Sequence, residues 1–149
     1  MRPARVQAKA IESTKKRRPG LDVWDNGFWS KLDKLVATSS LKIDRPRGST
    51  HPRYPSFFYP LDYGYLENTL ACDGGGIDVW VGSLSQRRIT GVICTVDLEK
   101  RDAEVKILLG CTPKEAREIL AIHNSGPQSA IWVEHPDVQC TMVDQASES

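Results

Sequence analysis

Four prolines crowd into residues 44–65, at Pro46, Pro52, Pro55 and Pro60. A proline inside a helix removes a backbone hydrogen bond and collides with the preceding turn, so this stretch cannot be helical. Proline also interrupts strand pairing everywhere except at edges and bulges. We therefore expect extended segments and turns that lie against a sheet and present side chains.

The rest of the chain favours short strands with one helix near either end. Apolar runs predict strands at 77–81, 91–96, 103–109 and 129–133. Strand alternation puts Asp102, Glu104 and Lys106 on one face of the third strand. An amphipathic helix is expected from about Asn26 to the 38–40 break, with Trp29 as a core anchor.

A second helix is predicted by the Thr112–Glu115 segment, which has capping-box spacing with Pro113 at the first helical position. The apolar stripe behind it ends near Asn124 and Gly126. The fold class that follows is mainly β with peripheral helices.

Length and charge divide the chain into three parts. With 149 residues it holds about one domain, which we place at 21–140, followed by a frayed C-terminus at 141–149. Residues 1–20 carry seven basic side chains and one acid, a net charge of +6, as in a disordered tail. Contact with nucleic acid or phospholipid, organelle targeting, or an upstream mis-start of the coding sequence are the alternatives for this tail.

The remaining residues carry 13 basic and 18 acidic side chains, so the folded part is mildly acidic and nucleic acid is not expected as its partner. No apolar run is long enough for a transmembrane helix or a signal peptide. Cys72, Cys94, Cys111 and Cys140 lack metal-ligand spacing, which indicates free thiols in a reducing cytoplasm.

Asp73 and Asp78 stand five positions apart around the triple glycine 74–76, directly behind a tyrosine-rich segment. Two carboxylates on a tight turn are suited to hard divalent cations, which prefer several carboxylate oxygens. A turn aspartate that binds its own backbone is the alternative for Asp73, and a charged hairpin that faces water is the alternative for Asp97 and Asp102.

Residues 59–82 read YPLDYGYLENTLACDGGGIDVWVG. This segment resembles the signature of the soluble inorganic pyrophosphatases, a YPxNYGY-like segment followed by Asp-x-Asp-Pro-x-Asp. Gly75 replaces the middle aspartate here and Gly76 replaces the proline. The resemblance implies a small closed OB-like β-barrel. It also implies Mg²⁺-dependent hydrolysis of inorganic pyrophosphate to two phosphates, by in-line attack of a metal-activated water.

The resemblance further implies the site residues. Metal ligands would be Asp73, Asp78, Asp97 and Asp102, and the phosphates would be held by Lys106, Tyr63 and either Arg47 or Arg53. The family has a lysine two positions after its last aspartate, where this chain has Glu104. Either a two-residue insertion gives Glu104 and Lys106 those roles, or Asp102 binds metal and Lys106 reaches the phosphate from further along the same strand face.

The glycine at position 75 removes the acid expected to orient or deprotonate the water. Asp62 stands where the family has the asparagine of YPxNYGY, and we expect it to reach the water from the opposite wall and restore the base. A pyrophosphatase-like hydrolase of another phosphate anhydride or ester is one alternative function. A non-catalytic phosphate- or nucleic-acid-binding module is another. A homo-oligomer is also expected.

Overall fold

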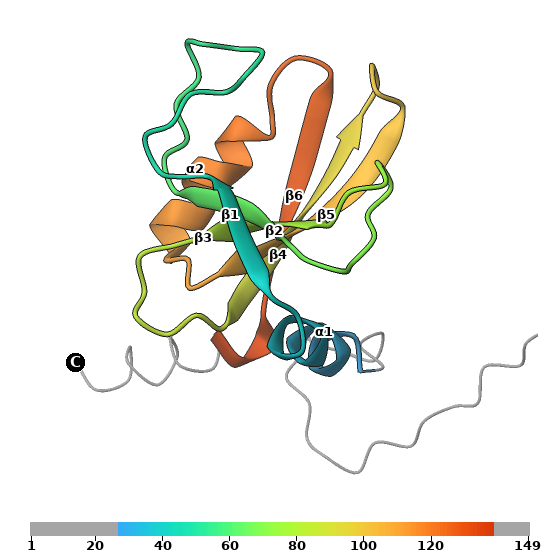
Figure 1. The fold of residues 1–149 in the computed structure, drawn as a ribbon, viewed down its shortest axis with the longest axis vertical. Coiled ribbons are helices and arrows are strands. Elements are labelled where there is room, and N and C mark those ends of the chain that lie inside the picture. The colour runs from blue at the N-terminus through green and yellow to red at the C-terminus, as the bar shows by residue number, and fades with distance from the viewer. Residues whose placement is uncertain (1–26, 139–149) are drawn as a thin grey trace, which may run out of the picture.

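The computed structural model describes residues 27–138, and within that range the fold is mainly β, as predicted (Figure 1). The predicted basic tail and frayed C-terminus lie outside the described residues. In chain order the elements are α1 (Phe28–Ala37), β1 (Leu41–Arg45), β2 (Asp62–Leu66), β3 (Ile77–Val81), β4 (Ile89–Asp97), β5 (Asp102–Leu109), α2 (Pro113–Ile122) and β6 (Gln128–Glu134).

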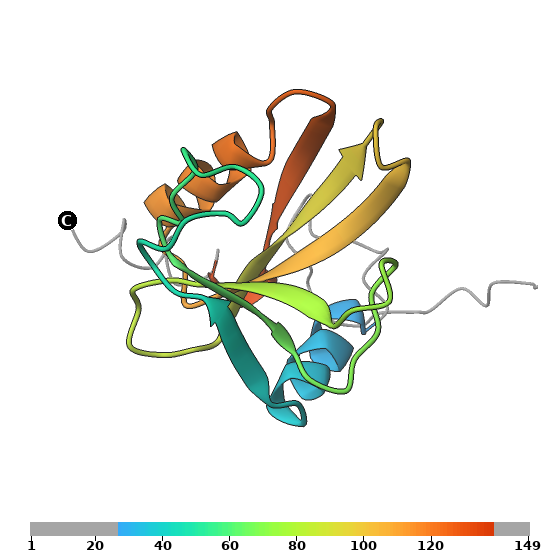
Figure 2. The ribbon, with the colours of Figure 1, turned by 45° about the horizontal axis from the view of Figure 1, so that its top comes forward.

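The strands form one sheet in the order β1-β2-β3-β5-β4-β6. Strand β5 pairs parallel with β3, whereas every other neighbouring pair is antiparallel. Figure 2 shows the sheet strongly bent, with β1, β2 and β3 turned against the other three strands. A closed barrel needs its first and last strands to pair. In residues 27–138 β1 and β6 are edges instead, so the closed barrel is not confirmed.

Helix α1 covers one face of the sheet. Trp29 is its buried anchor, as predicted, and packs with Leu66, Val79 and Ile107 in one hydrophobic core. The helix ends at Thr38, whose backbone N–H and hydroxyl both donate to the carbonyl of Lys34. No helix within the described range is long and apolar enough to cross a membrane.

Helix α2 covers the other face and begins with the predicted capping box. The backbone N–H of Glu115 donates to Thr112 Oγ1 at 3.2 Å, and the backbone N–H of Thr112 donates to Glu115 Oε1 at 2.9 Å. The side chains of Ala116 and Ile119 pack beneath the helix in a second core that includes Trp80. The two short helices therefore cover opposite faces of one sheet.

Register decides which side chains point towards α2. Val79 pairs with Ile107, and Trp80 pairs with Leu108. Since side chains alternate along a strand, Lys106 shares the α2 face with Trp80 and Leu108, whereas Val79 and Ile107 belong to the α1 core. The predicted alternation along residues 102–106 is confirmed.

Strand β1 crosses very close to β2 at Gly64. A Cβ placed on Gly64 would collide with the backbone carbonyl of Lys42 and would lie 2.9 Å from the Cα of Ile43. The pairing of β1 with β2 is irregular at this point, between Ile43 and Arg45. The glycine between Tyr63 and Tyr65 is therefore required by the close approach of two backbones.

Candidate active site around Lys106

Lys106 lies at the centre of a group of polar side chains on the α2 face. Its side chain is only 7% exposed, and Nζ donates to Asp78 Oδ2 at 2.7 Å and Glu104 Oε2 at 3.0 Å. A third bond, of 3.2 Å, reaches the hydroxyl of Tyr63. Strands β2, β3 and β5 are neighbours in the sheet, so three predicted site residues meet the ammonium group from three strands. We call Tyr63, Asp78, Glu104 and Lys106 the Lys106 group.

Charges within the Lys106 group fix its protonation states. Burial alone would lower the pKa of Lys106, but the oxygens of Tyr63, Asp78 and Glu104 outweigh burial and raise it above the usual lysine range. Burial would raise the pKa of Glu104, but the Lys106 ammonium holds it below the usual value. Burial, helped by Asp78, raises the pKa of Tyr63. At neutral pH the group therefore holds the Lys106 ammonium, the Glu104 carboxylate and the neutral Tyr63 phenol.

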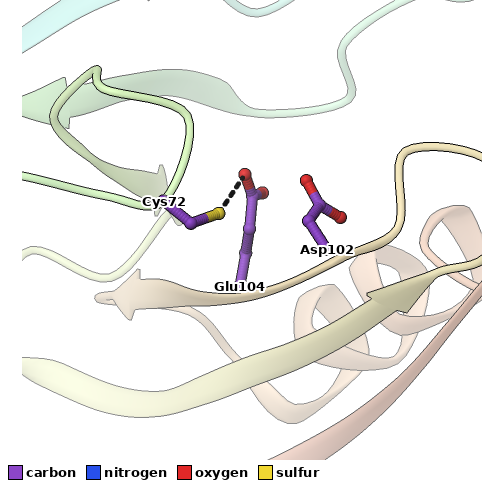
Figure 3. A group of neighbouring side chains, drawn as sticks. All are labelled: Cys72, Asp102 and Glu104. Atoms are coloured by element: carbon purple, nitrogen blue, oxygen red, sulfur yellow. Dashed lines mark hydrogen bonds between the residues drawn. The ribbon is translucent and has the colours of Figure 1, made fainter.

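Asp102 and Glu104 meet Cys72, a residue that sequence reasoning missed. One ligand atom from each of the three lies within 4.8 Å of the others, and Cys72 Sγ is 3.4 Å from Glu104 Oε1 (Figure 3). Cys72 has no cysteine or histidine at metal-ligand spacing in the sequence. Its place directly before Asp73 in the signature was the available signal.

Asp73 and Asp97 each use one oxygen to shape a turn. Asp73 Oδ1 accepts the backbone N–H of Gly75 at 2.9 Å, and Asp97 Oδ1 accepts the N–H groups of Glu99 and Lys100 at 2.9 Å each. Asp97 is buried opposite Asp102 in the β4–β5 pairing. Backbone binding by Asp73 matches the alternative given for a turn aspartate, and metal binding by these two residues stays a prediction.

Gly76 is as constrained as Gly64, because a Cβ there would collide with the carbonyl of Leu66 and lie 2.7 Å from Tyr65 Cδ2. Gly75 is different: its backbone is not left-handed, and the three atoms nearest to a Cβ there all belong to the carboxylate of Asp73, the first at 3.3 Å. A Cβ at 75 therefore meets an exposed side chain, whereas a Cβ at 76 meets backbone.

Asp62 does not join the Lys106 group. It alternates with Tyr63 along β2, so its side chain leaves the opposite face of the strand, and its Oδ1 accepts the backbone N–H of Arg47 at 2.8 Å. The expectation that Asp62 supplies the missing base from the opposite wall is therefore not supported by this geometry. The motif predicted an acidic residue at position 62 but did not show on which face of β2 its side chain lies.

Arg47 and Arg53 are exposed residues of the proline-rich loop. The backbone N–H of Arg53 donates to His51 Nδ1 at 3.0 Å. Neither arginine lines the pocket beside Lys106. Their predicted role in holding the phosphates stays a prediction.

A pocket of about 260 Å³ opens beside Lys106. His123 forms part of its wall, accepts the indole N–H of Trp80 at Nε2 (3.1 Å), and lies 2.8 Å from Gln128 Oε1 through Nδ1. Burial lowers the pKa of His123, so this ring is neutral and tied into the wall. The rest of the wall is largely aromatic and comprises His51, Tyr54, Phe57, Tyr59, Tyr63 and Trp80, of which the sequence predicted only Tyr63 as a site residue.

The donor set fits a divalent cation. Asp78 and Glu104 each bring a carboxylate to Lys106, which is buried, and an oxygen of Asp102 lies within 4.8 Å of an oxygen of Glu104. Carboxylate oxygens are the ligands that hard divalent metal ions prefer. A metal ion here would relieve the remaining repulsion between these carboxylates.

Comparison with known proteins identifies the family of the chain. A sequence model of the inorganic pyrophosphatase family matches residues 31–124. The inorganic pyrophosphatase of Vibrio parahaemolyticus is 41% identical over 75 residues, which cover 43% of each chain. That of Yersinia pestis is 36% identical over 83 residues, which cover 50% of this chain and 43% of that protein. That of Geobacillus stearothermophilus is 38% identical over 60 residues, covering 35% and 36%.

The chain spans about two fifths of the length of the curated relatives it matches. Among solved structures, the inorganic pyrophosphatase of Helicobacter pylori aligns with a TM-score of 0.45 and 14% identity, over 72% of this chain and 89% of that one. The family match covers well over half of the chain and contains the whole Lys106 group. On that match, the chain belongs to the inorganic pyrophosphatase family.

Proposed function

We propose that the protein hydrolyses inorganic pyrophosphate to two phosphates with Mg²⁺ as its cofactor. The observation that carries the proposal is the buried ammonium of Lys106. This side chain lines the pocket, and its Nζ lies 2.7 Å from Asp78 Oδ2. Membership of the inorganic pyrophosphatase family supports the same substrate. A buried cation next to several carboxylates suits a phosphate anhydride bound together with a metal ion.

The roles of the residues follow from their charges. Lys106 and Tyr63 would donate hydrogen bonds to phosphoryl oxygens, with Lys106 as a fixed point charge. Asp78, Asp102 and Glu104 would hold Mg²⁺ together with Asp73 and Asp97. When bound, Mg²⁺ neutralises phosphate charge and lowers the pKa of the attacking water. Because position 75 offers no carboxylate, proton removal from that water lacks a dedicated base.

The first test is phosphate release from pyrophosphate with and without Mg²⁺. We expect Asp78→Asn to lower kcat/KM by about a hundredfold or more, because a carboxylate facing both Lys106 and the metal is lost. Asp44→Asn is the matched control, since Asp44 is an exposed residue of β1 outside the site. Equal loss in both variants, or a wild type without activity at any Mg²⁺ concentration, would reject the proposal.

Gly75→Asp should raise the rate. The backbone at 75 accepts a side chain, and a carboxylate there would restore a base near the water, a function that typically contributes about 10²–10⁴ in rate. We expect kcat for pyrophosphate to rise at least about tenfold. Gly75→Asn, which has the same size without the charge, should not show the increase, and an equal rise in both variants would rule out a base effect.

A second candidate function is hydrolysis of a phosphate ester or anhydride with a planar organic group. The aromatic wall beside Lys106, formed in part by Tyr59 and Trp80, favours it, because an aromatic ring stacks well on such side chains. Phosphate release from nucleotides and sugar phosphates, measured in the same assay, separates the two functions. Faster release from a nucleotide than from pyrophosphate would favour the second.

Assembly as a homo-oligomer and a cytoplasmic location are also proposals. Support for the first is an apolar area on the face opposite the Lys106 group, where Val96 is 54% exposed, Val105 44% and Ile131 62%. Contiguous exposed apolar side chains are typical of subunit interfaces. Sedimentation velocity measures this state directly, and a monomer at micromolar concentration would contradict it.

A further inference from the structure

We propose that Cys72, Asp102 and Glu104 bind a borderline transition-metal ion such as Zn²⁺ or Co²⁺, with the Cys72 sulfur as the ligand that sets the preference. Three side chains of two ligand types converge, since Sγ and one oxygen of each carboxylate lie within 4.8 Å of one another (Figure 3). The inference adds a sulfur ligand to the carboxylates assigned to Mg²⁺ above. It therefore rests on the proposed function only in sharing Asp102 and Glu104.

The sheet explains why a cysteine reaches these acids. Cys72 lies in the loop between β2 and β3, whereas Asp102 and Glu104 lie two positions apart at the start of β5, on one face. Strand β3 runs parallel to β5, so the loop that enters β3 lies beside the beginning of β5. Segments about 30 positions apart in sequence thereby present their ligand atoms to a common point.

The distance between the cysteine sulfur and Glu104 agrees with two ligands of one tetrahedral ion. Zinc binds cysteine sulfur at about 2.3 Å and carboxylate oxygen at about 2.1 Å, which places S and O about 3.6 Å apart across a tetrahedral angle. The distance from Cys72 Sγ to Glu104 Oε1 is 3.4 Å. Little movement of these two side chains is needed for both to contact one ion. Three protein ligands also leave a fourth position for water or a substrate oxygen.

Lys106 fixes the orientation of the Glu104 side chain, one of the three proposed metal ligands. It binds Oε2 of Glu104, which leaves Oε1 turned towards Cys72. Groups that orient a metal ligand in this way typically change metal affinity by about 10–100-fold. Glu104 is thus fixed by a buried cation before any metal binds.

Ligand chemistry decides the identity of the metal. Magnesium prefers oxygen ligands and does not gain from sulfur. Thiolate together with carboxylate suits borderline ions, for which affinity rises along the first transition series. A sulfur ligand in this position therefore selects Zn²⁺ and Co²⁺ over Mg²⁺.

The test uses the full chain without pyrophosphate, with its thiols kept reduced by a phosphine. Titration with Co²⁺ should produce a thiolate-to-cobalt charge-transfer absorption in the near ultraviolet. Cys72→Ser should abolish the band and weaken Zn²⁺ binding in calorimetry at least about tenfold, with Mg²⁺ binding unchanged. Cys94→Ser is the matched control, since Cys94 is half-buried and outside this group.

Two results would overturn the inference. The first is equal Zn²⁺ affinity of the wild type and Cys72→Ser. The second is a cobalt band that survives unchanged in Asp102→Asn and Glu104→Gln, because Cys72 would then bind the metal as an isolated surface thiol. A protein that shows the expected band but does not release phosphate would support this inference and reject the proposed function, and the opposite pattern would do the reverse.

Discussion

Lys106→Met should remove pyrophosphate hydrolysis and destabilise the fold together. The substitution keeps most of the side-chain volume but leaves Asp78 and Glu104 facing each other without their buried cation. Removing one partner of a buried ion pair typically costs about 3–5 kcal/mol. Loss of a fixed positive charge on the phosphate should lower kcat/KM by about a hundredfold or more.

Denaturant unfolding and phosphate release measure the two effects of Lys106→Met. Lys100→Met is the control, because Lys100 lines the same pocket but is exposed. Its free energy of unfolding should change by about 0.5 kcal/mol or less. A stability loss for Lys106→Met no larger than that of Lys100→Met would show that the buried ion pairs contribute nothing.

The difference in free energy of unfolding between wild type and Lys106→Met should be constant through neutral pH and should decrease in acid. The pKa of Lys106 is raised, so its contribution is complete below the unfolded lysine pKa of about 10.4 and constant through neutral pH. The pKa of Glu104 is lowered, so its contribution is present above the unfolded value of about 4.3 and is lost as the pH falls through the folded value. The difference should therefore shrink in acid.

Gly64→Ala should be among the most destabilising single substitutions in the sheet. The added Cβ would collide with the carbonyl of Lys42 and lie 2.8 Å from its carbonyl carbon, and backbone atoms in a paired strand cannot move aside as a side chain can. Overpacking typically costs about 1–3 kcal/mol and more where the neighbour cannot yield. We expect a loss of about 3 kcal/mol, which corresponds to roughly 6–12 °C in Tm for a chain of this size.

Gly75→Ala is the matched control for Gly64→Ala. The three atoms nearest to a Cβ at position 75 belong to the side chain of Asp73, the first at 3.3 Å, and the backbone there is not left-handed. Its Tm should change by no more than about 2 °C. Thermal unfolding followed by circular dichroism compares the two variants, and equal shifts would show that the close approach of β1 is easily relaxed.

Local patterns predicted most of the elements. The capping box gave the start of α2 because its hydrogen bonds join residues three positions apart. Apolar runs likewise predicted β3 and β5, because the signal for each strand lies within its own consecutive residues. Prolines correctly marked the segment between β1 and β2 as non-helical, and turns and bends make up half of it. Closure of the sheet depends on pairing between its two ends, about which no local pattern carries information.

The candidate site was predictable in part. Alternation along β5 correctly placed Glu104 and Lys106 together, since both lie on one strand. Asp62 and Tyr63 are neighbours in β2 and leave opposite faces of it, which follows only once residues 62–66 are known to form a strand. Cys72 was missed because its partners lie on another strand and become neighbours only when β3 pairs with β5.

That parallel pairing also makes folding and chemistry depend on the same register. A slip of one residue between β3 and β5 would exchange the two faces of β5. Ile107 would then enter the polar pocket, and the charge of Lys106 would enter the apolar core beneath α1. Any sequence change that misaligns this pair would be eliminated for poor folding before it could be eliminated for lost catalysis. Selection for a well-packed core would therefore preserve the placement of Lys106 even in a descendant that no longer used it.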